Sequence, residues 1–267
     1  MSVNLAASRA LVTGASGGIG EAIVRALHAR GTTVVATARR QEVLDRLKAE
    51  LGDRVEVLSA DLAEAGDVES LPERAGRIDV LVANAALPAS GRYDEFSERE
   101  VDRALDVNLR APMHLARDLA GPMVERGSGH LVFISSLSGK TASPGSSLYS
   151  ATKFGMRGFA LGLREDLVGT GVGVTTVFPG FIRDAGMFHE SGTQLPKGVG
   201  TRTPDQVAAG VIRGIERDKP EVDVAPLSLR LGSIAGGIAP GAVGAAQRRL
   251  GSRDVAAQLA KGQAHKR

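Results

Sequence analysis

Short apolar segments with strand character alternate with amphipathic helical segments along most of the chain, and this alternation constrains the fold more than any other feature. The segments that we expect to form strands are residues 10–13, 33–37, 55–59, 78–83, 130–134, 173–178 and 222–224. The segments with helical periodicity are residues 19–29, 41–51, 98–125, 149–168 and 204–217. Strands separated by such helices pair in parallel and are covered on both faces. The sequence therefore predicts an α/β fold, a single doubly wound domain with a mostly parallel seven-stranded sheet and helices on both faces.

Length and composition limit the domain organisation and the possible metal sites. The chain has 267 residues, and no Pro/Ser-rich or charged linker interrupts the first 225. We therefore expect one domain over residues 1–226 and a basic Gly/Ala-rich extension over residues 227–267 that is not an independent domain. The absence of cysteine excludes disulfides and thiolate metal sites, and the five histidines are not clustered, so no metal site is expected.

The ends of the chain bear on its location. The N-terminal segment lacks the charged and apolar regions of a secretory signal. The longest uncharged run near the C-terminus, from Leu231 to Gln247, is interrupted by glycines and Pro240 and is short of a membrane span. We expect a cytoplasmic protein.

The first predicted strand is followed by a glycine-rich turn that contains Gly14, Ser16, Gly18, Ile19 and Gly20. Glycine lets the backbone approach a pyrophosphate closely, and the start of a helix offers free N–H groups with a partial positive charge. The spacing Gly-x-x-x-Gly-x-Gly differs from the general dinucleotide fingerprint Gly-x-Gly-x-x-Gly. The turn indicates a nucleotide phosphate site, with an ordinary tight strand–helix turn as the alternative.

The residues after the second predicted strand discriminate between cofactors. An acid at this place accepts the ribose 2′-hydroxyl of NAD, whereas arginine accommodates the 2′-phosphate of NADP. This chain has Arg39 and Arg40 there and no acid before Glu42. Because a guanidinium binds phosphate oxygens in a forked geometry, the sequence favours NADP(H) over NAD(H). The alternative is a solvated arginine pair.

Ser136, Tyr149 and Lys153 bring a hydroxyl, a phenol and an ammonium group into one short stretch. If residues 148–168 are helical, Tyr149 and Lys153 lie one turn apart on the same face. An adjacent ammonium group favours the phenolate, so we expect Lys153 to lower the pKa of Tyr149. A shift from about 10 to about 7 needs roughly 4 kcal/mol, which a partly desolvated cation and a cofactor's charge can supply. The alternative is a surface pair without a catalytic role.

In this order, the motifs resemble those of the short-chain dehydrogenase/reductase superfamily in its single-domain form. The resemblance runs from Leu5 to about Asp218. It includes the glycine turn, Asp61, Asn84, Asn108, Ser136, Tyr149-x-x-x-Lys153 and the pair Pro179 and Gly180. It implies a Rossmann-type fold, a nicotinamide cofactor and oxidoreductase activity on a carbonyl or an alcohol.

The resemblance also implies roles for four catalytic residues. Tyr149 would be the general acid in reduction or the base in oxidation, and Lys153 would tune it and bind the nicotinamide ribose. Ser136, at the family spacing before Tyr149, would hold and polarise the carbonyl oxygen. Asn108 is similar to the residue whose backbone carbonyl positions a water for proton relay. The alternative for Asn108 is a local hydrogen bond within its own helix.

Besides the glycine turn and the two arginines, the resemblance implies further cofactor contacts. These are Asp61, Leu62, Asn84, Ala85, Ala86, Tyr149, Lys153, Pro179, Gly180 and Ile182. Two positions depart from the family pattern. Ala86 stands where glycine is usual and narrows the space near the ribose, and Asp184 stands where threonine or serine is common, which puts that contact in doubt.

The sequence thus predicts an NADP(H)-dependent oxidoreductase that interconverts a carbonyl and an alcohol, with a small-molecule substrate and no nucleic-acid partner. The substrate pocket is expected from residues 87–96, 137–148 and 181–202, where apolar side chains predominate and favour a hydrophobic substrate: Leu87, Leu137, Leu148, Phe181, Met187 and Phe188. A catalytically silent NADP-binding sensor or scaffold is the alternative. A different reaction on the same scaffold, such as epimerisation, would usually come with a longer chain.

The C-terminal extension is the most individual part of the chain. Residues 227–267 carry seven basic residues and one acid, a net charge of +6, which leaves −3 for residues 1–226 because the total is +3. We expect a weak amphipathic helix packed on the domain, followed by a disordered basic end. The alternative is a segment that lies on an anionic membrane surface.

Assembly is the remaining expectation from the sequence. The resemblance implies a homodimer or homotetramer that forms through residues 98–125 and 149–168. The Asp-Gly-Gly sequence of many tetrameric relatives does not occur here, so the dimer is favoured.

Overall fold

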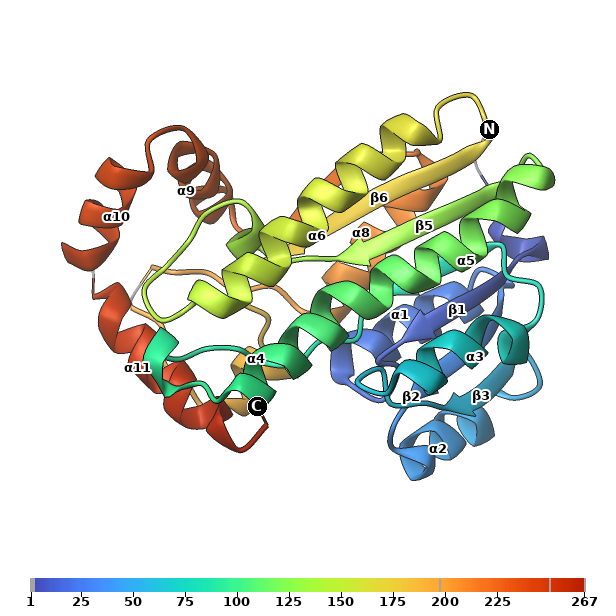
Figure 1. Cartoon of the computed structure of the whole chain (residues 1–267), viewed down its shortest axis with the longest axis horizontal. Coiled ribbons are helices and arrows are strands. Elements are labelled where there is room, and N and C mark those ends of the chain that lie inside the picture. Colours follow the sequence, from blue (N-terminus) through green and yellow to red (C-terminus); the bar gives the residue numbers. More distant parts are fainter. Residues whose placement is uncertain (1–2, 197, 250, 267) are drawn as a thin grey trace.

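Seven parallel strands form one sheet in the computed structural model, which describes residues 3–196, 198–249 and 251–266 (Figure 1). The strands are β1 (Arg9–Thr13), β2 (Thr33–Ala38), β3 (Val55–Ser59), β4 (Val80–Ala83), β5 (Gly129–Ile134), β6 (Val172–Pro179) and β7 (Glu221–Val224). Their order is β3-β2-β1-β4-β5-β6-β7, and every neighbouring pair is parallel. The predicted α/β class and doubly wound parallel sheet are confirmed.

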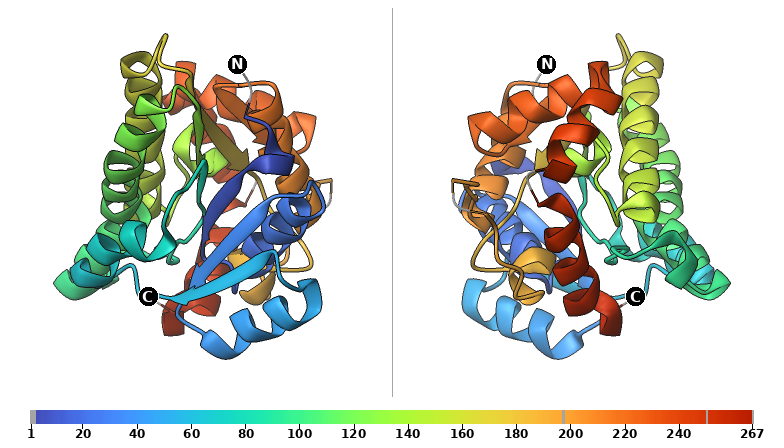
Figure 2. Two further views of the ribbon diagram at one scale, coloured as in Figure 1. Left: turned by 90° about the vertical axis from the view of Figure 1, so that its right-hand side faces the viewer. Right: turned by 90° about the vertical axis from the view of Figure 1, so that its left-hand side faces the viewer.

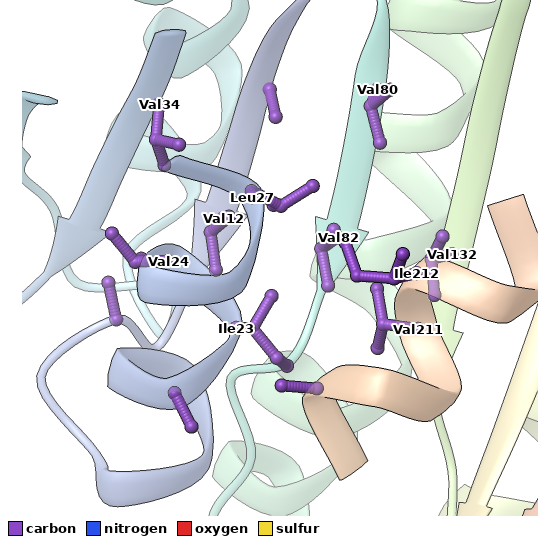
Figure 3. Close-up of a cluster of buried hydrophobic side chains, with 14 of the residues drawn as sticks. Val12, Ile23, Val24, Leu27, Val34, Val80, Val82, Val132, Val211 and Ile212 are labelled. Carbon is purple, nitrogen blue, oxygen red and sulfur yellow. The ribbon is translucent and has the colours of Figure 1, made fainter. Parts of the chain in front are cut away.

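Helices cover both faces of the sheet. One face packs against α1 (Gly18–His28), α2 (Gln41–Leu51) and α8 (Pro204–Glu216). The other packs against α3 (Ala65–Ala75), α5 (Ala111–Glu125) and α6 (Ser147–Asp166), with α4 (Glu98–Leu105) leading into α5. Because side chains alternate along a strand, Val12 lies in the first layer and its neighbour Leu11 in the second. Figure 3 shows the first layer, where Val12, Val34 and Val82 meet α1 and α8.

The long helix predicted over residues 98–125 is interrupted. A π-helical turn, Asp106–Arg110, separates α4 from α5. Such a turn inserts a residue into the helical ladder and frequently marks a functional site. The turn contains Asn108, so its position bears on the site described below.

Helices α3 and α7 and several short turns lie in segments for which the sequence predicted no secondary structure. The segment Ala65–Ala75 forms α3, whose Val68, Leu71 and Ala75 are buried. Pro72 inside this helix and its few apolar residues obscure the helical pattern. Shorter elements are α7 (Gly186–Glu190) and the 3₁₀ turns Leu5–Ala7, Tyr93–Glu95, Leu137–Gly139 and Ala264–Lys266.

The C-terminal extension folds into α9 (Leu227–Ile238), α10 (Pro240–Arg249) and α11 (Ser252–Gln263). The expectation of a disordered basic end is therefore wrong for the described residues. Among the helices that these residues form, none is long and apolar enough to cross a membrane. The strands β5 and β6 point toward the end of the molecule where α9, α10 and α11 lie (Figure 1).

A buried histidine links three elements of the core. The Nε2 atom of His130 on β5 lies 2.8 Å from the Thr175 hydroxyl on β6, and that hydroxyl donates to the Lys219 carbonyl at 2.7 Å. Since the Thr175 proton is used in this way, Nε2 carries a proton and donates to Thr175. Burial lowers the pKa of His130 to about 4.

We predict an acid-dependent loss of stability that depends on His130. Its folded pKa of about 4 is below the ordinary value of 6.5, so the unfolded chain binds the proton more readily and stability is lost as pH falls below 6.5. Between pH 7.5 and pH 5 this contributes a loss of about 2 kcal/mol in the free energy of unfolding. Urea unfolding at the two pH values measures it. The His130→Gln variant should lose less stability than the wild type over this interval, whereas the exposed His189→Gln control should match the wild type. Equal losses in all three would refute the assignment.

Candidate active site

The glycine turn lies at the point where the sheet reverses its direction of growth. From β1 the chain proceeds to β2 and β3 on one side and then crosses to β4 on the other. The turn follows β1 and begins α1. The N-cap residue of α1 is Gly17, which has no side chain to accept a hydrogen bond from the first N–H groups of the helix. The first N–H groups of α1 therefore remain available to an anion. In parallel sheets of this kind ligands bind at this switch point.

Glycine is required in this turn for close packing. Gly14 has a φ of +66°, and a Cβ there would lie 2.8 Å from the Ala85 Cα atom. A Cβ at Gly20 would overlap the Gly14 carbonyl. The turn is thus compact enough for a phosphate group to approach the backbone of Ser16, Gly18 and Ile19.

Thr13 and Asn84 connect the turn after β1 to the turn after β4. The Thr13 hydroxyl accepts hydrogen bonds from the backbone N–H groups of Asn84 and Ala85, both at 3.0 Å. The Asn84 side chain donates to the Thr13 and Gly14 carbonyls at 3.0 and 3.2 Å. Asn84 therefore holds the glycine turn in place through its side chain. Thr13 was missed as a site residue, although its place directly before Gly14 was a signal.

The two arginines after β2 lie beside the glycine turn. Arg40 donates to the Ser16 carbonyl at 2.6 Å. Arg39 is half exposed, and its guanidinium lies 3.7 Å from the Asp61 carboxylate, which also accepts from the Ala63 N–H at 3.0 Å. Leu62 beside it is buried. The uncapped helix start and these two guanidinium groups fit the phosphate groups of a dinucleotide.

Ser136, Tyr149 and Lys153 lie together where β5 ends and α6 begins. Ser136 is the second residue after β5 and is hydrogen-bonded to the half-buried Tyr149 through their side chains. The buried Lys153, one turn further along α6, has its Nζ atom 5.6 Å from the centre of the Tyr149 ring. That ammonium group donates to the Ile134 carbonyl at 3.0 Å. The structure thus brings the three side chains together.

The expected lowering of the Tyr149 pKa by Lys153 is not found in this structure. Loss of hydration raises the pKa of Tyr149 to about 12, and the Ser136 hydrogen bond opposes this only in part. Burial also lowers the pKa of Lys153 to about 8. Both shifts have one cause, because a low-dielectric surrounding disfavours the charged form of each group. The phenol is therefore protonated at neutral pH.

Ser135 and Ser138 support the three residues. The buried Ser135 hydroxyl donates to the Lys153 carbonyl at 3.0 Å and thereby joins α6 to the end of β5. The Ser138 N–H donates to the Ser136 hydroxyl oxygen at 3.1 Å. These bonds restrict the positions of Ser136 and Lys153. The sequence did not predict them.

Asn108 reaches out of its own helix. Its side-chain amide accepts from the Leu87 N–H at 2.6 Å and donates to the Leu87 carbonyl at 3.0 Å. The alternative of a local bond within the helix is therefore wrong for the side chain. This paired contact holds the segment after β4, including the half-buried Ala86, against the π-helical turn.

The segment after β6 crosses the glycine turn. Beyond Pro179, Gly180 donates to the Val224 carbonyl at 3.1 Å, and the buried Ile182 forms a parallel bridge with Arg202. Ala185 then contacts Gly18 at the start of α1.

The Asp184 carboxylate has a cationic partner of its own. Asp184 adopts a left-handed backbone with a φ of +72°. Its carboxylate lies 3.4 Å from the Arg183 guanidinium. This pairing reduces its repulsion of any phosphate bound at the turn.

Helix α11 spans two of the segments that the sequence assigned to the substrate pocket. Gln258 accepts from the Gln194 N–H at 3.0 Å, and Gln263 donates to the Met187 carbonyl at 3.1 Å. At its other side Ala256 packs against Gly145, four residues before Tyr149. Figure 2 (right) shows α11 running across this end of the molecule. The sequence did not predict these contacts of α11, because they join residues far apart in the chain.

We predict that Gly262 sets the distance between α11 and the segment after α7. A Cβ at Gly262 would lie 2.7 Å from the Ser191 Cα atom, a contact that the backbone cannot yield to without moving. Gly262→Ala should therefore displace α11 and raise the amide hydrogen-exchange rate of residues 186–194 by about tenfold or more. Gly232→Ala is the matched control, since a Cβ there meets open space. Unchanged exchange in the Gly262 variant would show that α11 does not restrain this segment.

Comparison with known proteins identifies the family. The short chain dehydrogenase family model matches residues 8–196. Nodulation protein G of Rhizobium sp. (strain N33) is 42% identical over 185 residues, 68% of this chain and 76% of that protein. Ketoacyl reductase HetN of Nostoc sp. is 37% identical over 222 residues, 80% of this chain and 77% of that protein. A short-chain dehydrogenase from Sphingobium yanoikuyae in complex with NADPH has a TM-score of 0.77 at 28% identity and covers 86% of this chain and 93% of its own. The chain belongs to the short-chain dehydrogenase/reductase superfamily, a family of oxidoreductases that use nicotinamide cofactors.

Proposed function

We propose that this oxidoreductase interconverts a carbonyl group and an alcohol with NADP(H), and that Tyr149 transfers the proton. The observation that carries this proposal is the grouping of Ser136, Tyr149 and Lys153 after β5, at the same carboxyl-end edge of the parallel sheet as the glycine turn after β1. A bound nicotinamide would supply or accept the hydride. The chain's own residues then have to hold the carbonyl oxygen and deliver or remove one proton.

Tyr149 suits the role of proton donor in reduction. With its pKa raised to about 12, the phenol holds its proton at neutral pH and can pass it to a carbonyl oxygen that becomes an alkoxide. Ser136 is the second donor for that oxygen and restricts the position of the Tyr149 hydroxyl. Lys153, with a pKa of about 8, still carries its charge at pH 7 and stabilises the phenolate that remains after transfer.

Asn108 is a positioning residue in this proposal. Its side chain holds the Leu87 backbone next to the π-helical turn. As the family resemblance implies, its backbone carbonyl would hold a water through which Lys153 exchanges its proton. A catalytically silent NADP-binding sensor is less well supported, because such a protein has no need of the assembled Ser136, Tyr149 and Lys153.

A preference for NADP(H) is supported by the end of β2. Arg39 and Arg40 lie beside the turn, and only Arg40 is bonded to it. The half-exposed Arg39 makes a loose contact with Asp61, so it is free to turn toward a 2′-phosphate. The NADPH complex of the Sphingobium dehydrogenase supports the same cofactor.

A hydrophobic carbonyl compound is the substrate class that we propose. Phe181 and Phe188, in the segment after β6, pack together with their ring centres 5.0 Å apart. Leu137 and Leu229 lie next to Gly180 in the same region. These apolar side chains and the neighbouring α11 favour an acyl or other lipophilic chain, and the name of ketoacyl reductase HetN supports that class.

We expect Tyr149→Phe to lower kcat by about 10²-fold or more, because the substitution removes only the proton donor. Turnover is followed by NADPH absorbance with a panel of lipophilic ketones and aldehydes. NADPH should still bind with a dissociation constant within about threefold of the wild type, since little binding energy is lost. Tyr93→Phe is the control, because Tyr93 is the other tyrosine and is exposed. A Tyr149→Phe enzyme with full activity would overturn the mechanism.

The cofactor preference is tested by exchanging a charge at Arg39. Arg39→Asp should weaken NADPH binding by about tenfold or more, because a charge-assisted hydrogen bond to phosphate is lost, and leave NADH binding nearly unchanged. Dissociation constants for both reduced cofactors provide the measurement. Arg46→Asp, an equal change at an exposed site on α2, controls for net charge. The preference is absent if wild-type protein binds NADH as tightly as NADPH, and Arg39 is not its source if both variants behave alike.

A further inference from the structure

Helix α9 presents its large apolar side chains to solvent. Leu227, Leu231, Ile234 and Ile238 are 64%, 58%, 52% and 80% exposed. Their spacing of four, three and four residues places them on one side of the helix, and we call them the α9 stripe. They make up half of the large hydrophobic side chains that are exposed in the described part of the chain. A contiguous exposed patch of this kind marks an interaction surface.

The orientation of α9 is set by its small residues. Ser233 and Gly236 are its buried positions, and Gly236 packs against Thr141. Arg230 lies 3.6 Å from the Asp223 carboxylate at the end of β7. An ordinary surface helix turns its large apolar residues toward the core, so α9 is reversed relative to that rule. Close packing of small residues against the domain leaves the α9 stripe as the outer face.

Basic residues follow the stripe. Arg248, Arg249 and Arg253 in α10 and α11 are exposed, and no ion pair of these three is found among the described residues. The extension as a whole carries a net charge of +6, with Asp254 as its one acid. The segment from Leu227 to Gln247 contains one charged residue, Arg230. A nearly uncharged segment is therefore followed by a strongly basic one.

We propose that the α9 stripe and the following arginines bind the surface of an anionic lipid membrane. Apolar side chains insert at the boundary between headgroups and acyl chains, and nearby arginines gain from the negative surface potential. Both features are met in one segment here. The orientation also follows from the fold. Helix α9 lies at the end of the molecule to which β5 and β6 point (Figure 1), so binding through the α9 stripe would bring that end of the protein to the bilayer.

A second copy of the chain fits this surface less well. Four side chains of this size offer an area on the order of 400 Å², about half of the roughly 800 Å² per partner that a stable interface buries. A symmetric contact would also bring two extensions of net charge +6 together, and like charges across an interface are unfavourable. The same positive charge strengthens binding to an anionic lipid surface.

Co-sedimentation of the full chain with vesicles tests the proposal. The protein should bind vesicles that contain phosphatidylglycerol about tenfold more than vesicles of phosphatidylcholine alone, and 0.5 M salt should remove most of this difference. Leu231→Ser with Ile238→Ser should reduce binding by about tenfold, because two inserted side chains are lost. Arg248→Glu with Arg249→Glu should abolish the preference for phosphatidylglycerol. Val168→Ser, an exposed apolar residue elsewhere at 72% exposure, should bind like the wild type.

Light scattering after size-exclusion chromatography distinguishes a lipid surface from a second copy of the chain as the partner of the α9 stripe. The molar mass in solution should be the same for the wild type and for the double variant Leu231→Ser, Ile238→Ser. No binding to phosphatidylglycerol vesicles at low salt overturns the proposal, and so does equal loss in the Val168 variant. A lower mass of the stripe variant assigns the surface to a second copy instead. These readouts need neither turnover nor cofactor, so they stand or fall separately from the proposed reaction.

Discussion

The hydrogen bonds between the turn after β1 and the turn after β4 are the constraint on which the rest of the site depends. Two strands that the chain visits far apart in sequence end side by side, and the Thr13 hydroxyl accepts the N–H groups of both Asn84 and Ala85. Thr13 is buried, so its loss would leave these donors without a partner away from water, which costs more than the net value of a hydrogen bond. The same clamp holds Gly14 against Ala85 and so shapes the start of α1.

The electrostatics of Tyr149 and Lys153 follow from burial more than from their proximity. A lysine one turn away would lower a phenol pKa if both groups were equally hydrated, which is what helical spacing alone suggests. In the structure the ammonium group donates to the Ile134 carbonyl, and the low-dielectric surrounding opposes the charged forms of both residues. The consequence is a phenol that keeps its proton at neutral pH, because burial raises the pKa of Tyr149 to about 12.

Local patterns and motif order predicted much of the fold and placed the candidate site, and the failures have identifiable physical causes. The seven strands, the glycine turn and the grouping of Ser136, Tyr149 and Lys153 follow from periodicity and from parallel-strand geometry. Helix α3 was missed because Pro72 and its few apolar residues conceal a three-residue buried face. The π-helical turn was missed because no local pattern marked it, and the bonds that Asn108 within it makes are to Leu87, 21 residues away in the chain. The position of α11 depends on contacts with Met187 and Gln194, which no local pattern encodes.

The extension shows why the amphipathic pattern of a helix does not tell which side is buried. Periodicity in α9 is clear, yet Gly236 and Ser233 face the protein and the α9 stripe faces solvent, with Leu229 alone of its large apolar residues turned toward Gly180. Small residues let two segments approach closely and make many weak dispersion contacts. Large apolar residues stabilise the structure only if another surface covers them. Helix α11 is held against the segment after β6 by two glutamines and a glycine, whereas α9 retains an uncovered apolar face at the same end of the molecule. The extension thereby packs against the segment after β6 through α11 and presents an uncovered apolar face to the exterior through α9.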